Sequence, residues 1–184
     1  MIREERVSQW SEGGRIPLSL VGLGLLFTLA WPCSIWAASV HLPTIRAVAG
    51  ELVEVPVYLE KVENLAGMKL VLSYNSKILT FQEERKAPIA QSLMHIVNPQ
   101  IPGKLIVVMA GAKGVQVNNG PIIYLTFKVN DKIGSQKKIL IKIEEVQLMT
   151  DQLKTLNPTI KDGEVMLLEK TPPKSTQKRG GVIQ

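Results

Sequence analysis

Apolar and polar residues alternate with a period of two along most of the chain after residue 38. Successive side chains of a strand point to opposite faces, so this alternation predicts strands that bury one face. The apolar members of the clearest stretches are Val53, Val55, Val57 and Leu59, then Met68, Leu70, Leu72 and Tyr74, then Ile123, Leu125, Phe127 and Val129, and finally Ile139, Ile141 and Ile143. Residues 105–110 are instead continuously apolar, which is typical of a strand whose outer side is also covered or binds a partner.

Turn-forming residues separate the alternating stretches, and no amphipathic helical pattern lies between them. The turn signals are Asn75-Ser76, Pro102-Gly103, Asn119-Gly120, Asn130-Asp131 and Asp162-Gly163. We expect nine strands, over residues 39–46, 51–59, 66–74, 78–83, 92–98, 104–110, 121–130, 137–148 and 163–169. Strands this frequent predict an all-β fold, a nine-stranded antiparallel β-sandwich over residues 38–169. Pro56 lies inside one strand pattern and has no N–H, which favours a sheet edge or a bulge there.

Residues 1–37 have a different character from the rest. No charged residue occurs over residues 16–40, arginines precede this stretch, and Pro32 and Ala37 follow its most apolar part. A basic start, a hydrophobic helix and a small-residue exit are typical of a secretory signal peptide, here with cleavage after Ala37. The alternative is an uncleaved signal anchor, because the uncharged stretch is long enough to span a bilayer. In both cases we expect residues 38–184 to be exported, to a periplasmic, cell-surface or extracellular location.

The net charge of +6 is unevenly distributed along the 184 residues. Residues 38–169 carry 15 Lys or Arg and 13 Asp or Glu, whereas residues 170–184 carry four basic residues and no acidic one. The folded part is therefore close to neutral and does not predict a nucleic-acid surface. The end of the chain is rich in Pro, Lys, Ser and Gly, which predicts a basic disordered tail. The single cysteine, Cys33, lies in the N-terminal segment, so no disulfide is expected in the exported part.

Motifs that carry catalysis, metal binding or cofactor binding are absent from the sequence. It has two histidines, His41 and His95, and neither belongs to a zinc-ligand spacing. No nucleophile elbow, phosphate-binding loop or dinucleotide fingerprint occurs. The doublets Glu83-Glu84 and Glu144-Glu145 lie in strand patterns, where neighbours point to opposite faces, so neither is expected to form an acid–base pair. We therefore expect a non-enzymatic protein without a metal or other cofactor.

Several segments, taken in their order, resemble those of one known family. They are residues 49–57 (AGELVEVPV), 67–79 (GMKLVLSYNSKIL), 104–111 (KLIVVMAG), 119–120 (NG) with 125–129 (LTFKV), and 162–165 (DGEV). With them, residues 47–168 resemble a cohesin domain, the β-sandwich receptor module of cellulosomes and related surface assemblies. The resemblance implies a jelly-roll-like topology, no catalysis and a dockerin-like protein partner bound on an exposed sheet face. An envelope protein is the other partner that we expect for an exported module of this kind.

The resemblance also implies where a partner would bind. The family's type I pattern has Asn and Asp at the start of its recognition strand, and these positions fall on Gly67 and Lys69. A carboxylate that accepts a partner's hydroxyl is thus replaced by a cation, which can only donate. We expect an outward face made by two neighbouring strands, with Lys69, Val71 and Ser73 on one strand and Leu105, Val107 and Met109 on the other. Alternatively, a loop or the N-terminal segment covers these apolar residues.

Two other functions remain open. A carbohydrate-binding module linked to polysaccharide degradation would stack planar aromatic rings against sugar faces. No tryptophan occurs after residue 38, and only Tyr58 and Tyr124 alternate outward, so these two are the candidate sugar-stacking residues. The other alternative is a structural component of an envelope or of a secretion system, since one fold serves many functions.

Overall fold

The computed structural model describes residues 37–131 and 136–168. They form ten strands and one 3-10 helical turn, η1 (Pro88–Ala90). The strands are β1 (Ser39–His41), β2 (Thr44–Val48), β3 (Leu52–Tyr74), β4 (Leu79–Lys86), β5 (Met94–Asn98), β6 (Lys104–Val129), β7 (Lys138–Thr150), β8 (Thr155–Leu156), β9 (Thr159–Lys161) and β10 (Gly163–Leu168). No helix in these ranges is long and apolar enough to cross a membrane. The expected N-terminal hydrophobic helix and the tail at residues 170–184 lie outside the described residues.

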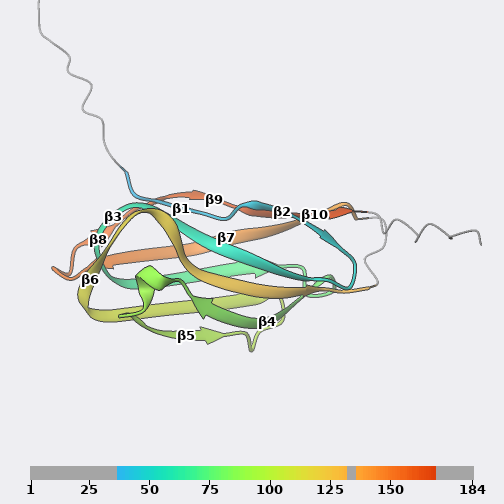
Figure 1. The fold of residues 1–184 in the computed structure, drawn as a ribbon, viewed down its shortest axis with the longest axis horizontal. Coiled ribbons are helices and arrows are strands. Elements are labelled where there is room, and N and C mark those ends of the chain that lie inside the picture. The colour runs from blue at the N-terminus through green and yellow to red at the C-terminus, as the bar shows by residue number, and fades with distance from the viewer. Residues whose placement is uncertain (1–36, 132–135, 169–184) are drawn as a thin grey trace, which may run out of the picture. The chain divides into compact units, whose positions relative to one another are not determined.

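Two long strands, β3 and β6, pair with each other twice and pass through both layers of the fold. The first part of β3 (residues 52–60) pairs with the last part of β6 (119–128). The last part of β3 (67–73) pairs with the first part of β6 (104–110). Both strands bend between these parts, at the end of the fold that carries β8 (Figure 1). One hydrogen-bonded sheet therefore folds over on itself into a two-layered sandwich.

Each layer contains one half of β3 and one half of β6 at its centre. The first layer has the order β2, β10, β7, last part of β3, first part of β6, β5. The second layer has the order β9, β1, first part of β3, last part of β6, β4. Most neighbours are antiparallel, but β10 pairs with β2, and β1 with β9, in parallel. The all-β sandwich expected from the alternation is confirmed, with two parallel pairs in addition.

The core lies between the two layers and consists of the residues that the alternation placed inward. Val55 and Leu125 from the second layer are buried, as are Leu70 and Ile141 from the first. Phe127 is fully buried in this core. Its ring meets Tyr74 of the opposite layer and Phe81 of β4 edge-on, with ring centroids 5.0 and 5.7 Å apart, a favourable aromatic arrangement.

The strand boundaries differ from the sequence prediction in three respects. Four expected strands are joined in pairs: residues 51–59 and 66–74 lie in β3, and residues 104–110 and 121–130 lie in β6. The segments between them form no turn, because they pair with each other at Val62–Val117 and Leu65–Val115 through β-bulges. The expected strand at residues 39–46 is divided into β1 and β2, and the short β8 and β9 were not expected.

Pro56 lies at a local sheet edge within β3. On one side Pro56 is opposite Tyr124 of β6, but on the other side β1 extends only as far as Tyr58. A register shift follows directly, between Val57 and Tyr58. Pro56 therefore lies where no strand pairs on its second side and next to an irregularity of the ladder, as the sequence predicts.

Candidate binding face

The outer surface of four first-layer strands forms one continuous face, which we call the β5–β7 face. Directly opposed residues of paired strands share a face, so the register determines its members. They are Met94, Ile96 and Asn98 of β5, Lys104, Ile106, Val108 and Ala110 of β6, Gly67, Lys69, Val71 and Ser73 of β3, and Lys142, Glu144, Glu145, Gln147 and Met149 of β7.

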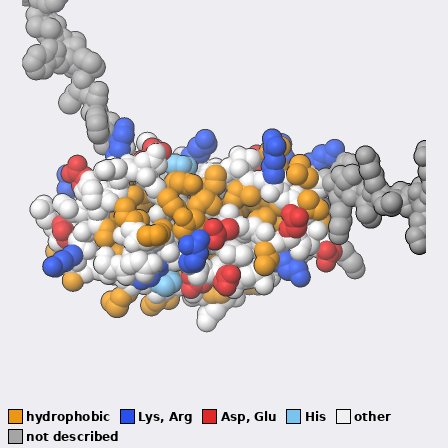
Figure 2. Space-filling model, viewed as in Figure 1, with side chains coloured by type: hydrophobic (Ala, Val, Ile, Leu, Met, Phe, Trp, Pro, Cys, Tyr) orange, Lys and Arg blue, Asp and Glu red, His pale blue; other side chains and the backbone are white. Residues whose placement is uncertain are grey.

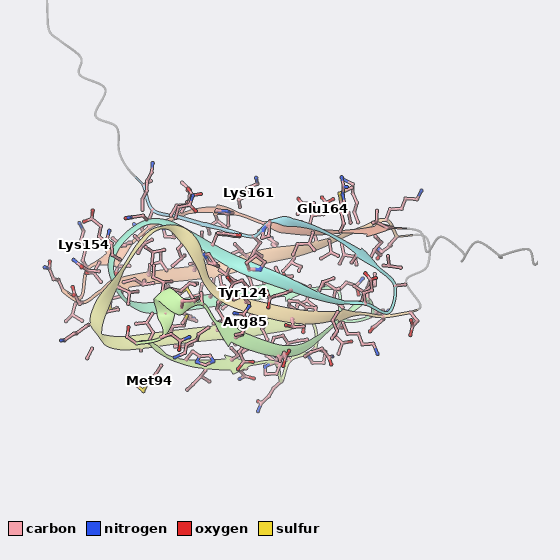
Figure 3. The ribbon with its side chains drawn as sticks, in the orientation of Figure 1. Arg85, Met94, Tyr124, Lys154, Lys161 and Glu164 are labelled. Atoms are coloured by element: carbon pink, nitrogen blue, oxygen red, sulfur yellow. The ribbon has the colours of Figure 1, made fainter. Side chains whose placement is uncertain are left out.

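Apolar side chains occupy the β5 side of this face. Met94 and Ile96 are 76% and 72% exposed, and Val108, directly opposite Ile96, is 41% exposed. Figure 3 shows the Met94 side chain projecting outward from β5. Ile106, two residues before Val108 on β6, is half-buried beside them. Several exposed apolar side chains in adjacent positions are typical of an interaction surface.

Two ion pairs lie on the β3 and β7 side of the β5–β7 face. The Nζ of Lys69 donates to both carboxylate oxygens of Glu145 at 2.9 Å, and the Nζ of Lys104 lies 3.3 Å from a carboxylate oxygen of Glu144. A bulge in the middle of β7 directs both glutamates outward, which corrects the expectation that these neighbours face opposite sides. Hydrogen bonds from the Ser73 hydroxyl and from Lys104 lower the pKa of Glu144 below its ordinary value.

Lys69, Val71 and Ser73 all lie on the β5–β7 face. Val71 is only 4% exposed, yet it is outside the core cluster, since it lies on the outer side between Ile106 and Glu145. The Lys69 ammonium is occupied by Glu145. Whether these side chains contact a partner stays a prediction.

The expectation that Leu105, Val107 and Met109 of β6 face outward was wrong. Leu105, Val107 and Met109 point into the core and are 0%, 0% and 1% exposed. They lie opposite the inward residues of β3, in the pairs Leu72–Leu105, Leu70–Val107 and Met68–Met109. The run at residues 105–110 is apolar at every position, so it carries no alternation, and only the register with β3 decides which residues face inward.

Sequence reasoning missed the four large apolar side chains of β5 and β6 that do face outward. They are Met94, Ile96, Ile106 and Val108. On β5, both Ile96 and its neighbour Val97 are apolar, so the sequence does not show which of the two faces outward. A register for β5 against β6 would have been needed to find them.

Tyr58 and Tyr124, the candidate sugar-stacking residues, lie on the outer face of the second layer. The Tyr58 ring is stacked on His41, with ring centroids 5.0 Å apart and planes 5° apart. The guanidinium of Arg85 lies 4.1 Å from the centre of the Tyr124 ring (Figure 3). One face of each ring is therefore occupied by a protein group, which reduces the area open to a sugar. Their proposed sugar stacking stays a prediction.

The described residues contain no arrangement that would organise a metal ion. Within residues 37–131 and 136–168, no three His, Cys, Asp or Glu side chains are close enough to share one. On the side of the molecule drawn in Figure 2, Lys and Arg side chains are interspersed with Asp and Glu side chains. The β5–β7 face offers apolar contact area and paired charges, which suit docking of another molecule.

Comparison with known proteins identifies the type of domain that the sequence resembles. A family model described as "Cohesin domain" matches residues 38–167. No curated protein matches the chain.

Three solved structures illustrate the likeness of the fold. A type I cohesin–dockerin complex from Clostridium thermocellum is 21% identical, with a TM-score of 0.64, and the alignment covers 71% of this chain and 93% of that one. The sixth cohesin of scaffoldin B from Acetivibrio cellulolyticus, in complex with a Cel5 dockerin, is 18% identical, with a TM-score of 0.65 and coverages of 72% and 99%. A non-cellulosomal cohesin from the archaeon Archaeoglobus fulgidus is 15% identical, with a TM-score of 0.64 and coverages of 72% and 92%.

Proposed function

Because this chain belongs to the cohesin domain family, we propose that it is a non-catalytic module that binds a protein partner through its β5–β7 face. A dockerin-type partner is the first candidate, since two of the similar structures are complexes with a dockerin. We further propose that the module acts after export, on the basis of the signal-like residues 1–37.

The exposed apolar side chains of β5 and β6 are the observation that carries this proposal. Met94, Ile96 and Val108 are adjacent and accessible, whereas most other large apolar side chains of these two strands are buried in the core. Binding energy at protein interfaces is concentrated in a few apolar or aromatic side chains that lose contact with water. Ile96 and Val108 lie directly opposite each other and would form the centre of such a contact.

The two glutamates of the β5–β7 face are already paired within the domain. Glu145 is bound by Lys69, and Glu144 by Lys104 and Ser73. These carboxylates would therefore contribute little to attracting a charged partner over a distance. Apolar contact is expected to supply most of the affinity, with only a small dependence on salt concentration.

Substitution of the central apolar pair tests the face directly. In I96E or V108E, docking would bury an unpaired carboxylate, so we expect the Kd for a bound dockerin to rise about 30-fold or more, equivalent to about 2 kcal/mol. Isothermal titration calorimetry of the purified chain with the dockerin modules of the same organism measures this. L52E is the matched control, because Leu52 is 63% exposed but lies on β3 in the second layer.

Two outcomes would contradict different parts of the proposal. Unchanged affinity in both I96E and V108E, with a dockerin that binds the wild-type chain, would show that the β5–β7 face is not the docking surface. Failure of the wild-type chain to bind any of these dockerins would contradict a dockerin-type partner. An exported envelope protein would then be the partner to test with the same variants.

A further inference from the structure

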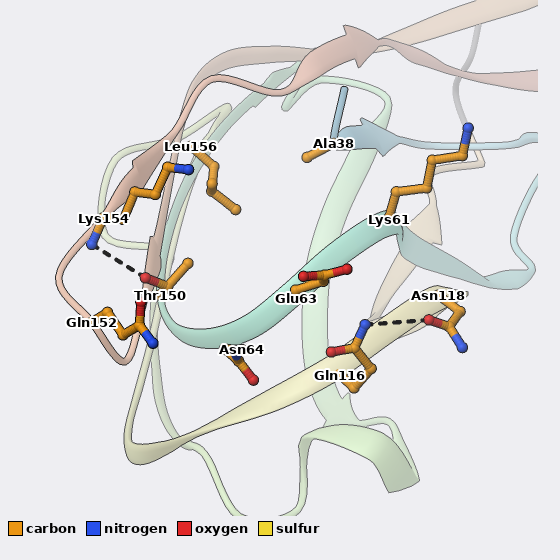
Figure 4. A pocket seen from close by; sticks show the side chains of 10 residues that line it. All are labelled: Ala38, Lys61, Glu63, Asn64, Gln116, Asn118, Thr150, Gln152, Lys154 and Leu156. Carbon is orange, nitrogen blue, oxygen red and sulfur yellow. Dashed lines mark hydrogen bonds between the residues drawn. The ribbon is translucent and has the colours of Figure 1, made fainter. Parts of the chain in front are cut away.

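A polar cleft lies at the end of the sandwich where β3 and β6 bend from one layer to the other. Its volume is about 580 Å³, within the range of small-molecule sites. Figure 4 shows four carboxamide side chains around it, those of Asn64, Gln116, Asn118 and Gln152. None of the residues of the β5–β7 face lines this cleft, so it is a separate feature of the molecule.

The backbone around this cleft is held in conformations that most residues avoid. The described residues other than glycine that have a positive φ are Lys61 (54°), Asn64 (53°) and Leu153 (61°). Lys61 and Asn64 line the cleft, and Leu153 lies between its lining residues Gln152 and Lys154. Residues in the left-handed region cost free energy, and such residues concentrate at functional sites.

Contacts from three segments hold this part of the chain in place. The carbonyl of Asn64 accepts a hydrogen bond from the Asp151 N–H at 3.0 Å, which joins β3 to the turn after β7. Gly114 of β6 packs so closely that a Cβ there would lie 2.5 Å from the Asn64 backbone. On the other wall, the Thr150 hydroxyl accepts from the Lys154 N–H at 3.2 Å. The backbone that carries these lining residues is therefore held in place before any ligand binds.

The lining chemistry favours a neutral ligand with many hydroxyl groups. Each carboxamide both donates and accepts, and so does a hydroxyl, so the two match in every orientation. Glu63 lies between the carboxamides of β6 and the turn after β7 (Figure 4), and it opposes binding of an anion. Lys61 and Lys154 at the rim oppose binding of a cation. Leu156 adds an apolar surface against which the C–H face of a sugar ring can pack.

A peptide strand fits this cleft less well. Peptides that extend a sheet pair with free backbone N–H and C=O groups at a strand edge. The strands that form these walls are already paired, at Val62–Val117 between β3 and β6 and at Met149–Thr155 between β7 and β8. The cleft therefore presents mainly side-chain amides to a ligand.

We propose that this cleft binds a neutral saccharide of one or two rings, independently of protein docking on the β5–β7 face. Titration of the isotope-labelled full chain with maltose, cellobiose, lactose and mannobiose, followed by amide NMR shifts, tests the proposal. At least one disaccharide is expected to cause saturable shifts that centre on residues 61–64, 116–118 and 150–156.

Three variants test whether these amide shifts arise from binding in the cleft. Q116A and N118A are expected to weaken the binding at least fivefold each. N64G removes a carboxamide but keeps a residue that tolerates a φ of 53°, so it separates loss of ligand contact from backbone strain. Q82A is the matched control and is expected to bind as the wild type does, because Gln82 is an exposed amide on β4 that bonds only to neighbouring carbonyls.

The proposal is overturned if no disaccharide produces saturable shifts, or if the shifts centre on Tyr58 and Tyr124 instead. It is also overturned if a neutral Gly-Ser peptide shifts the cleft amides while the disaccharides do not. Loss of dockerin binding in I96E leaves these titrations unchanged, so the two proposals fail separately.

Discussion

At the scale of single residues, the β5–β7 face is organised by the surroundings of two adjacent glutamates. Glu144 accepts hydrogen bonds from Ser73 and Lys104, and Glu145 is bound through both oxygens by Lys69. Exposed ion pairs of this kind contribute little to stability on their own. Their effect on the face is to hold four charged side chains in fixed pairs beside the apolar residues.

Removal of the Ser73 hydroxyl is expected to raise the pKa of Glu144. This pKa is lowered in the folded chain first by the hydrogen bond from Ser73 and then by Lys104, relative to an ordinary value of 4.5. The stabilisation is therefore present above the unfolded pKa and is lost as the pH falls through the folded pKa. NMR titration of the Glu144 carboxyl carbon in S73A should show a midpoint closer to 4.5 than in the wild type.

T80A serves as the comparison for this titration, because Thr80 bonds to Asn130 on the other layer. Its Glu144 midpoint should equal that of the wild type. An unchanged midpoint in S73A would show that the hydroxyl does not bind the carboxylate in solution.

At the scale of elements, the pairing of β6 decides which of its apolar side chains face the core and which face outward. Val107 is 0% exposed and faces the core, whereas its neighbour Val108 is 41% exposed and faces outward. The strand is apolar at both positions, so its own sequence is compatible with either assignment. Pairing with β3, which alternates clearly, selects one of them.

Glutamate substitutions at these two neighbours should therefore have very different effects on stability. V107E places an unpaired carboxylate in the core and is expected to lower the free energy of unfolding by about 3 kcal/mol or more. V108E is expected to change it by less than about 1 kcal/mol, because the new side chain reaches water. Urea denaturation followed by circular dichroism measures both values, and equal or reversed losses would contradict the face assignment.

At the scale of the whole molecule, the two-layered fold separates two surfaces that serve different proposals. The β5–β7 face is the outer side of one layer, and the polar cleft lies where the chain crosses to the other layer. A protein partner and a saccharide could be bound together, since no residue is shared between the two.

Export of the module can be tested on the native chain. If residues 1–37 are a signal peptide, protein secreted or released from the cell envelope should begin at Ala38, as intact-mass measurement and N-terminal sequencing would show. A full-length chain in the membrane fraction would instead indicate the signal anchor. Recovery of the full-length chain in the cytoplasm would contradict both.

The sequence by itself determined the fold class, most of the strands and most of the core. Alternation at positions such as Val55, Leu70 and Leu125 follows from the pleat of a single strand, so it can be read locally. The segments that resemble those of cohesin domains, taken in their order along the chain, were also sufficient to indicate a cohesin-like module.

Only the tertiary structure decided which residues form the binding face and the cleft. The outward position of Ile96 and Val108 depends on the register between strands, and a shift of one residue would reverse it. The outward position of Glu145 beside Glu144 depends on a bulge, and the cleft joins Asn64, Gln116 and Gln152, which are far apart in the chain. Pairing of this kind is a property of two or more segments together, so no single stretch of sequence contains it.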